Sequence, residues 1–142
     1  MTRAIARLVW GSALVLPLAF LAVAATRRGP GALPVAAPPL LLWSAIAASF
    51  AAIALAHALP PRLGPSRAGR EATVLTRLAV AWALCEGAAL FPAVAWMVTG
   101  DARLLGVFGV DLLAIVTLFP SERRLAALVP GDGPDEPGDR WR

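Results

Sequence analysis

Two acidic residues, Glu86 and Asp111, stand inside long apolar stretches of the sequence and could do chemistry there. A charged side chain at the centre of a membrane-spanning helix costs about 2.5–3.5 kcal/mol on insertion scales. Each acid is therefore expected to rest in its neutral form and to find a hydrogen-bond partner inside the protein. Intramembrane carboxylates often mark proton or ion pathways. The first hypothesis is a proton- or cation-binding site at Glu86, with Asp111 as its partner.

A structural role is the alternative for both acids. Glu86 could be a permanently neutral acid that holds helices together, and the sequence favours neither role. For Asp111 the structural role is preferred. It would hydrogen-bond Glu86, or the carbonyl of Ala88, which Pro92 leaves without its helical donor. The spacing of the two acids leaves a contact between them open. Measured from the cytoplasmic edge of the membrane, Glu86 and Asp111 lie at the same depth, but measured from the outer edge their depths differ.

The other reactive residues are few and scattered. The single cysteine, Cys85, excludes a disulfide or a cysteine-based zinc site within one chain, and the single histidine, His57, excludes ligation by two histidines. The hydroxyl residues of the apolar runs, Ser12, Ser44, Ser49 and Thr117, have no base nearby in the sequence. There is no Walker-type glycine loop, H-E-x-x-H or C-x-x-C motif. We therefore expect no cofactor and no metal, and an enzyme is the least supported class.

The elements that must position these acids follow from the composition. Of the 142 residues, 58% are hydrophobic and 15% are charged, whereas soluble domains have roughly 45–50% and about 25%. The mean hydropathy is +0.71. The apolar residues fall into four runs of nearly spanning length, roughly 20 residues each. The sequence therefore predicts an all-α polytopic membrane protein, a bundle of four transmembrane helices, with no room for a soluble catalytic domain.

Prolines, glycines and arginines bound the predicted spans. The spans cover about residues 5–25, 40–59, 76–99 and 103–119, and a short interfacial helix over 121–129, with Ser121 as its N-cap, follows them. Residues 1–129 would form one membrane domain, and residues 130–142 a disordered tail. Residues 1–24 also resemble a cleavable signal peptide. Their uncharged run has 18 residues, whereas the apolar core of a signal peptide usually has about 7–15. A retained helix is therefore preferred.

Arginine supplies every basic residue, and its distribution predicts the orientation. Ten arginines fall on the side shared by both termini and the loop between the second and third spans, and three fall on the other side. Because cytoplasmic loops are rich in arginine, the termini are expected in the cytoplasm, below a bacterial inner membrane. This distribution also accounts for the net charge of +4 without nucleic-acid binding.

Small residues predict where helices pack closely. One face of the second span carries a small residue at every fourth position, at Ser44, Ala48, Ala52 and Ala56. Ala83 and Gly87 form a similar pair beside Glu86. Such residues let helix backbones approach one another in lipid. Apart from the lipid bilayer, the expected partners are therefore helices of the same chain, of a second copy or of other membrane subunits.

The run Ala83-Leu84-Cys85-Glu86-Gly87-Ala88-Ala89-Leu90-Phe91 resembles the carboxylate helix of rotary ATPase proteolipid (c) subunits. That family also places one acid among small residues in mid-membrane, after a small-residue helix and a cytoplasmic polar loop. The resemblance implies that Glu86 is the ion-carrying carboxylate. This chain adds a fourth span with its own acid, Asp111.

The second hypothesis is a non-catalytic membrane subunit or assembly factor that acts through helix packing.

Overall fold

The computed structural model describes residues 2–28, 35–64 and 69–128. Over these ranges the chain is helical and has no strand, which confirms the predicted all-α class. The elements are α1 (Thr2–Arg28), α2 (Pro39–Ala58), a 3₁₀ turn η1 (Pro60–Arg62), α3 (Arg70–Thr99), α4 (Ala102–Thr117) and α5 (Glu122–Leu128). The expected tail over 130–142 lies outside the described residues.

The helices differ in their capacity to cross a membrane. In the described part of the chain, α1, α2 and α3 are each long and apolar enough to do so. Helix α4 has only 16 residues. It passes the same test only together with α5, from which it is bent by 81°. The protein therefore has three helices of spanning character, or up to four if the bent pair counts as one span.

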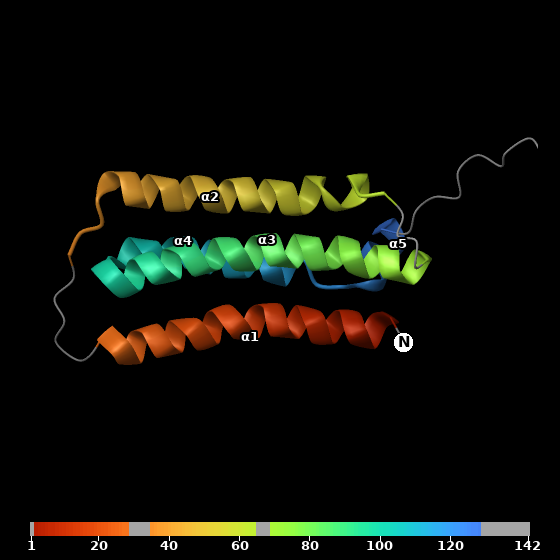
Figure 1. Ribbon diagram of the computed structural model, residues 1–142, viewed down its shortest axis with the longest axis horizontal. Coiled ribbons are helices and arrows are strands. Elements are labelled where there is room, and N and C mark those ends of the chain that lie inside the picture. Colours follow the sequence, from red (N-terminus) through yellow and green to blue (C-terminus); the bar gives the residue numbers. More distant parts are fainter. Residues whose placement is uncertain (1, 29–34, 65–68, 129–142) are drawn as a thin grey trace, which may run out of the picture.

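The helices form three layers (Figure 1). Helices α3 and α4 lie side by side in the middle, with α2 on one side of them and α1 on the other. Helix α3 contacts α1, α2 and α4, so it is the central helix of the bundle. The N-terminus of α1 and helix α5 lie at one end of the bundle, and the α3–α4 turn lies at the other, which we call the turn end.

Among the helix boundaries, the start of α3 differs most from the prediction, and the start of α5 has a clear local cause. Helix α3 begins at Arg70, six residues before the predicted start. The apolar run marks only part of this helix, and the polar residues before it continue the same turns. Helix α5 begins at Glu122 as expected for a helix capped by Ser121, whose Oγ accepts a hydrogen bond from the backbone N–H of Arg124 at 3.3 Å.

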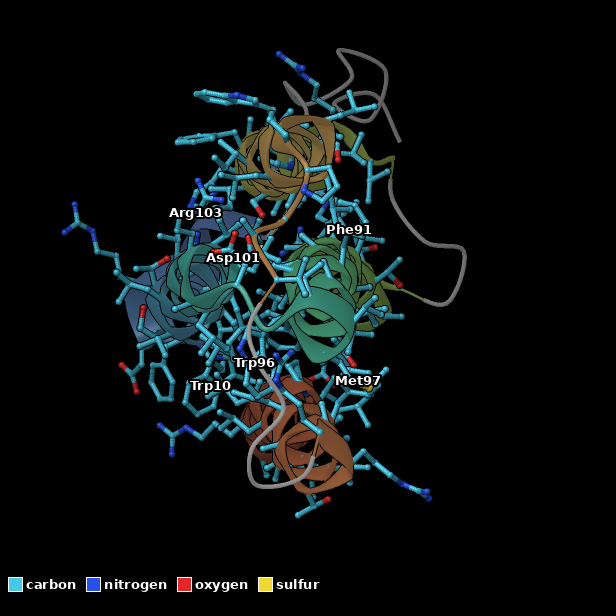
Figure 2. All side chains as sticks on the ribbon, turned by 90° about the vertical axis from the view of Figure 1, so that its left-hand side faces the viewer. Trp10, Phe91, Trp96, Met97, Asp101 and Arg103 are labelled. Atoms are coloured by element: carbon cyan, nitrogen blue, oxygen red, sulfur yellow. The ribbon has the colours of Figure 1, made fainter. Side chains whose placement is uncertain are left out.

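Tryptophan side chains fix α1 to the middle layer (Figure 2). The indole N–H of Trp10 donates to the carbonyl of Ile115 on α4 at 2.9 Å. At the turn end, the guanidinium of Arg28 donates to the carbonyl of Trp96 at 3.1 Å and lies over the indole ring, 5.9 Å from its centroid. The last carbonyls of a helix carry partial negative charge. Arg28 therefore stabilises the end of α3 while it anchors α1.

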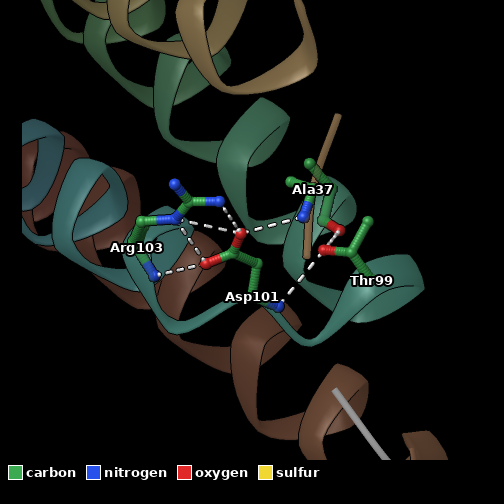
Figure 3. A network of polar contacts seen from close by, with 5 residues as sticks. Ala37, Thr99, Asp101 and Arg103 are labelled. Carbon is green, nitrogen blue, oxygen red and sulfur yellow. Dashed lines mark hydrogen bonds and ion pairs between the residues drawn. The ribbon is translucent and has the colours of Figure 1, made fainter. Parts of the chain in front are cut away.

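A polar network closes the turn end (Figure 3). Asp101 is the N-cap of α4, and its carboxylate accepts hydrogen bonds from the backbone N–H of Ala37 at 2.9 Å and from Nη2 of Arg103 at 2.6 Å. The side chain of Arg103, and then the backbone N–H groups of Ala37 and Arg103, hold the pKa of Asp101 well below its usual range. The network ties the segment before α2 to the α3–α4 turn.

Candidate intramembrane carboxylate site

Asp111 occupies a core position of α4. Residues spaced three and four apart share one face of a helix, and the buried face of α4 carries Leu104, Phe108, Asp111 and Ile115. Asp111 is 0% exposed, so this acid replaces an apolar residue in the stripe that packs against the rest of the bundle. The length and phase of α4 thus place its carboxyl group in the interior.

Ser49 on α2 is the hydrogen-bond partner of Asp111. Its hydroxyl donates to Oδ2 of Asp111 at 2.8 Å, and the serine itself is buried. The other oxygen, Oδ1, has no hydrogen-bond partner among the described residues. A buried polar atom without a partner costs about 1–3 kcal/mol, so this oxygen is the natural place for a bound proton.

Cys85 adds a third helix to this group. It is fully buried on α3 and belongs to the same core cluster as Ala114 and Ile115 of α4. We call Asp111, Ser49 and Cys85 the polar centre. It joins α4, α2 and α3 in the interior of the bundle, and chemically it can hold one proton on a neutral acid, next to a hydroxyl donor.

Glu86 lies outside the polar centre. Successive residues of a helix are turned by about 100°, so Glu86 faces away from the direction of its neighbour Cys85. Its side chain is partly exposed and makes no hydrogen bond or ion pair with any residue that the structure describes. The contact between Glu86 and Asp111 that the spacing left open is not formed, because α3 turns the Cys85 side toward α4. Nor does Asp111 bond the carbonyl of Ala88: its partner is Ser49.

The predicted small-residue faces turn mostly outward. On α2, Ser44 and Ala48 are exposed, Ala52 is partly exposed, and only Ala56 is buried. The face of α2 that packs within the chain is the adjacent one, with Ala45 and Ser49. On α3, Ala83 and Gly87 are both exposed. The described chain therefore makes little use of these stripes for its own packing, apart from Ala56 and the half-buried Ala52.

Sequence reasoning missed Ser49. The regular spacing of small residues drew attention to Ser44, one turn and one residue away. The available signal was that a buried acid needs a donor and that α2 carries few hydroxyl groups. Choosing between its two serines required the rotation of α2 about its axis, which only packing sets.

A groove between α2 and α4 borders one residue of the polar centre, Ser49. Its volume is about 340 Å³. Ser49 forms part of the wall, Arg103 lines it as well, and the remaining lining is largely apolar: Ile46, Phe50, Ile53, Gly106, Val107 and Val110. Ser49, the hydrogen-bond partner of Asp111, is therefore one of the residues that line this groove.

Among residues 2–28, 35–64 and 69–128, no three His, Cys, Asp or Glu side chains are grouped so that they could hold a metal ion.

Comparisons with protein-family models, with curated proteins and with solved structures found no match to this chain. The class that the fold defines is an all-helical protein with several helices compatible with a membrane.

Proposed function

We propose that this chain is a bundle of four transmembrane helices in a bacterial inner membrane, with both termini in the cytoplasm. The arginine distribution supports this orientation. Helix α4 has 16 residues, and at about 1.5 Å per residue it falls several ångströms short of a hydrocarbon core of about 30 Å. Short spans are accommodated by local thinning and by flanking residues. Arg103 at one end of α4 and the bent helix α5 at the other are suited to this.

Within this bundle, we propose that Asp111 takes up and releases a proton. One observation carries the proposal: Asp111 is completely buried, with one oxygen bonded to Ser49 and the other unpaired in the described chain. A buried charge without a counter-ion is expensive, so the neutral acid is the resting form. When the proton leaves, the Ser49 hydroxyl stabilises the carboxylate. The groove beside Ser49 supplies the route by which water reaches the site.

Proton flux into liposomes tests this proposal. The purified protein is reconstituted around a trapped pH-sensitive dye, and a potassium diffusion potential drives protons inward. We expect Asp111→Asn to abolish the flux, because asparagine keeps an acceptor for Ser49 but cannot titrate. Ser49→Ala should slow it. Ser44→Ala is the matched control, since Ser44 is exposed on the same helix and bonds its own Leu41 carbonyl.

Two outcomes would contradict the assignment to Asp111. If Asp111→Asn and the wild type give equal flux, Asp111 is a structural acid. If Glu86→Gln abolishes the flux while Asp111→Asn does not, the ion site is at Glu86, as the resemblance to proteolipid subunits implies. Infrared spectroscopy gives an independent readout. The absorption band of the protonated, buried Asp111 carboxyl group should be missing in Asp111→Asn and present in Glu86→Gln.

A second candidate function, a membrane subunit that binds another helix, has its own supporting observation. Glu86 has no partner in the described chain, and Ala83 and Gly87 beside it are exposed. A Cβ atom added at Gly87 would meet nothing within 4 Å. A helix of a second copy could approach closely here and offer Glu86 a donor. Gly87→Leu should then lower the mass of the detergent-solubilised particle, measured by light scattering, whereas Val94→Leu on the same exposed side should not.

A further inference from the structure

A pocket lined by two arginines lies at the end of the bundle opposite the turn end. It is bounded by the last turn of α2 and η1, by the first half of α3, and by α5, and its volume is about 190 Å³. Its lining residues are Ala56, His57, Pro60, Pro61, Arg77, Leu78, Ala81, Leu118, Arg124, Ala127 and Leu128. We call this cavity the arginine pocket. It is distinct from the groove between α2 and α4.

Arg77 is held rigidly in the wall of the arginine pocket. It is only 7% exposed. Its Nε and Nη2 donate to the carbonyl of Leu63 at 3.2 and 2.6 Å, and its Nη1 donates to the carbonyl of Leu128 at 2.7 Å. These bonds use three of the five N–H donors of a guanidinium. Arg77 thus joins η1 to α5 and retains two donors.

Arg124 reaches the same pocket from α5. Its Nη1 donates to the carbonyl of Thr117 at 2.6 Å. Neither Arg77 nor Arg124 forms an ion pair with a carboxylate in the part of the chain that the structure describes. Carbonyl dipoles satisfy some of the donors but do not neutralise the charges. Two partly desolvated cations beside one cavity therefore favour an anion.

We propose that the arginine pocket binds the phosphate group of an anionic phospholipid between Arg77 and Arg124. The pocket volume of about 190 Å³ is enough for a phosphate group and the first atoms of its esters. Arginine pairs well with phosphate oxygens because its donors form a planar fork. The apolar part of the lining suits the glycerol and acyl carbons better than a sugar or a base. Basic pockets on the cytoplasmic side of membrane helices are typical lipid headgroup sites.

Thermal unfolding of the detergent-solubilised protein with added lipid tests the proposal. The probes are phosphatidylglycerol, phosphatidylcholine and inorganic phosphate, each titrated separately. Phosphatidylglycerol should raise the unfolding temperature of the wild type. Arg124→Gln should need about tenfold more of this lipid for the same shift, because it loses a charge-assisted hydrogen bond. Arg123→Gln is the matched control, since it removes the same charge from an exposed position next along α5.

Three results would overturn the proposal. An equal loss in Arg123→Gln and Arg124→Gln would mean that only net charge matters. An equal shift with phosphatidylcholine would mean that the lipid acts without charge recognition. An equal shift with inorganic phosphate alone would overturn the lipid as the source of the phosphate. The proposal rests on the membrane topology proposed above and not on proton transfer, so Asp111→Asn should keep the full lipid shift.

Discussion

The hydrogen bond between Ser49 and Asp111 leads to a prediction about stability that can be tested without any activity assay. Ser49→Ala removes the only donor that the described chain offers to Asp111, so both carboxyl oxygens would then be buried without partners. An unsatisfied buried polar group costs about 1–3 kcal/mol. Hydrogen bonds between membrane helices are weaker on average, with coupling energies of about 0.6 and at most about 1.7 kcal/mol. Because the acid is 0% exposed, we expect Ser49→Ala to cost about 1–2 kcal/mol.

The assay is reversible unfolding from mixed micelles, followed by tryptophan fluorescence. Ser44→Ala provides the baseline. Ser44 is exposed and bonds within its own helix, so this change should stay within about 0.5 kcal/mol. A double-mutant cycle of Ser49→Ala with Asp111→Ala then isolates the pairwise energy, which should lie between about 0.6 and 1.7 kcal/mol. If Ser49→Ala is as mild as Ser44→Ala and the coupling energy is near zero, the polar centre is not formed as described.

Two further predictions concern the turn end. The lowered pKa of Asp101 means that its contribution to stability is complete above the unfolded pKa of about 3.9. The contribution is lost only as the pH falls through the lower pKa of the folded state. Acid unfolding of Asp101→Asn should therefore lack this pH-dependent component, although Arg103 is still charged. Gly100→Ala should destabilise the protein by about 1–2 kcal/mol, because Gly100 has a φ of +70° and the guanidinium of Arg28 fills the space of a Cβ atom. Gly106→Ala is the control in the same unfolding assay, since an added Cβ meets nothing within 4 Å there, and it should be neutral or stabilising by up to about 1 kcal/mol.

Local patterns were sufficient to predict the five α-helices of the described chain. The lengths of the apolar runs and the breaks at proline and glycine predicted the helices, and they were least accurate where a helix continued into polar sequence, as at Arg70. The hydroxyl of Ser121 marked the start of α5 because capping involves only neighbouring residues. The candidate acids were also evident in the sequence, since a carboxyl group in an apolar run is conspicuous whatever the fold.

The roles of the two acids needed the tertiary structure. Sequence reasoning put Glu86 at the centre and Asp111 beside it, whereas packing buries Asp111 and leaves Glu86 partly exposed. The tertiary structure was also needed to identify Ser49, which sequence reasoning overlooked, and Arg77, which joins η1 to α5. Sequence by itself determined that the chain folds into apolar helices and that two of them carry an acid. Only the tertiary structure decided which acid turns inward, because adjacent positions on a helix point about 100° apart and the rotation of each helix is set by contacts with residues far away in the chain.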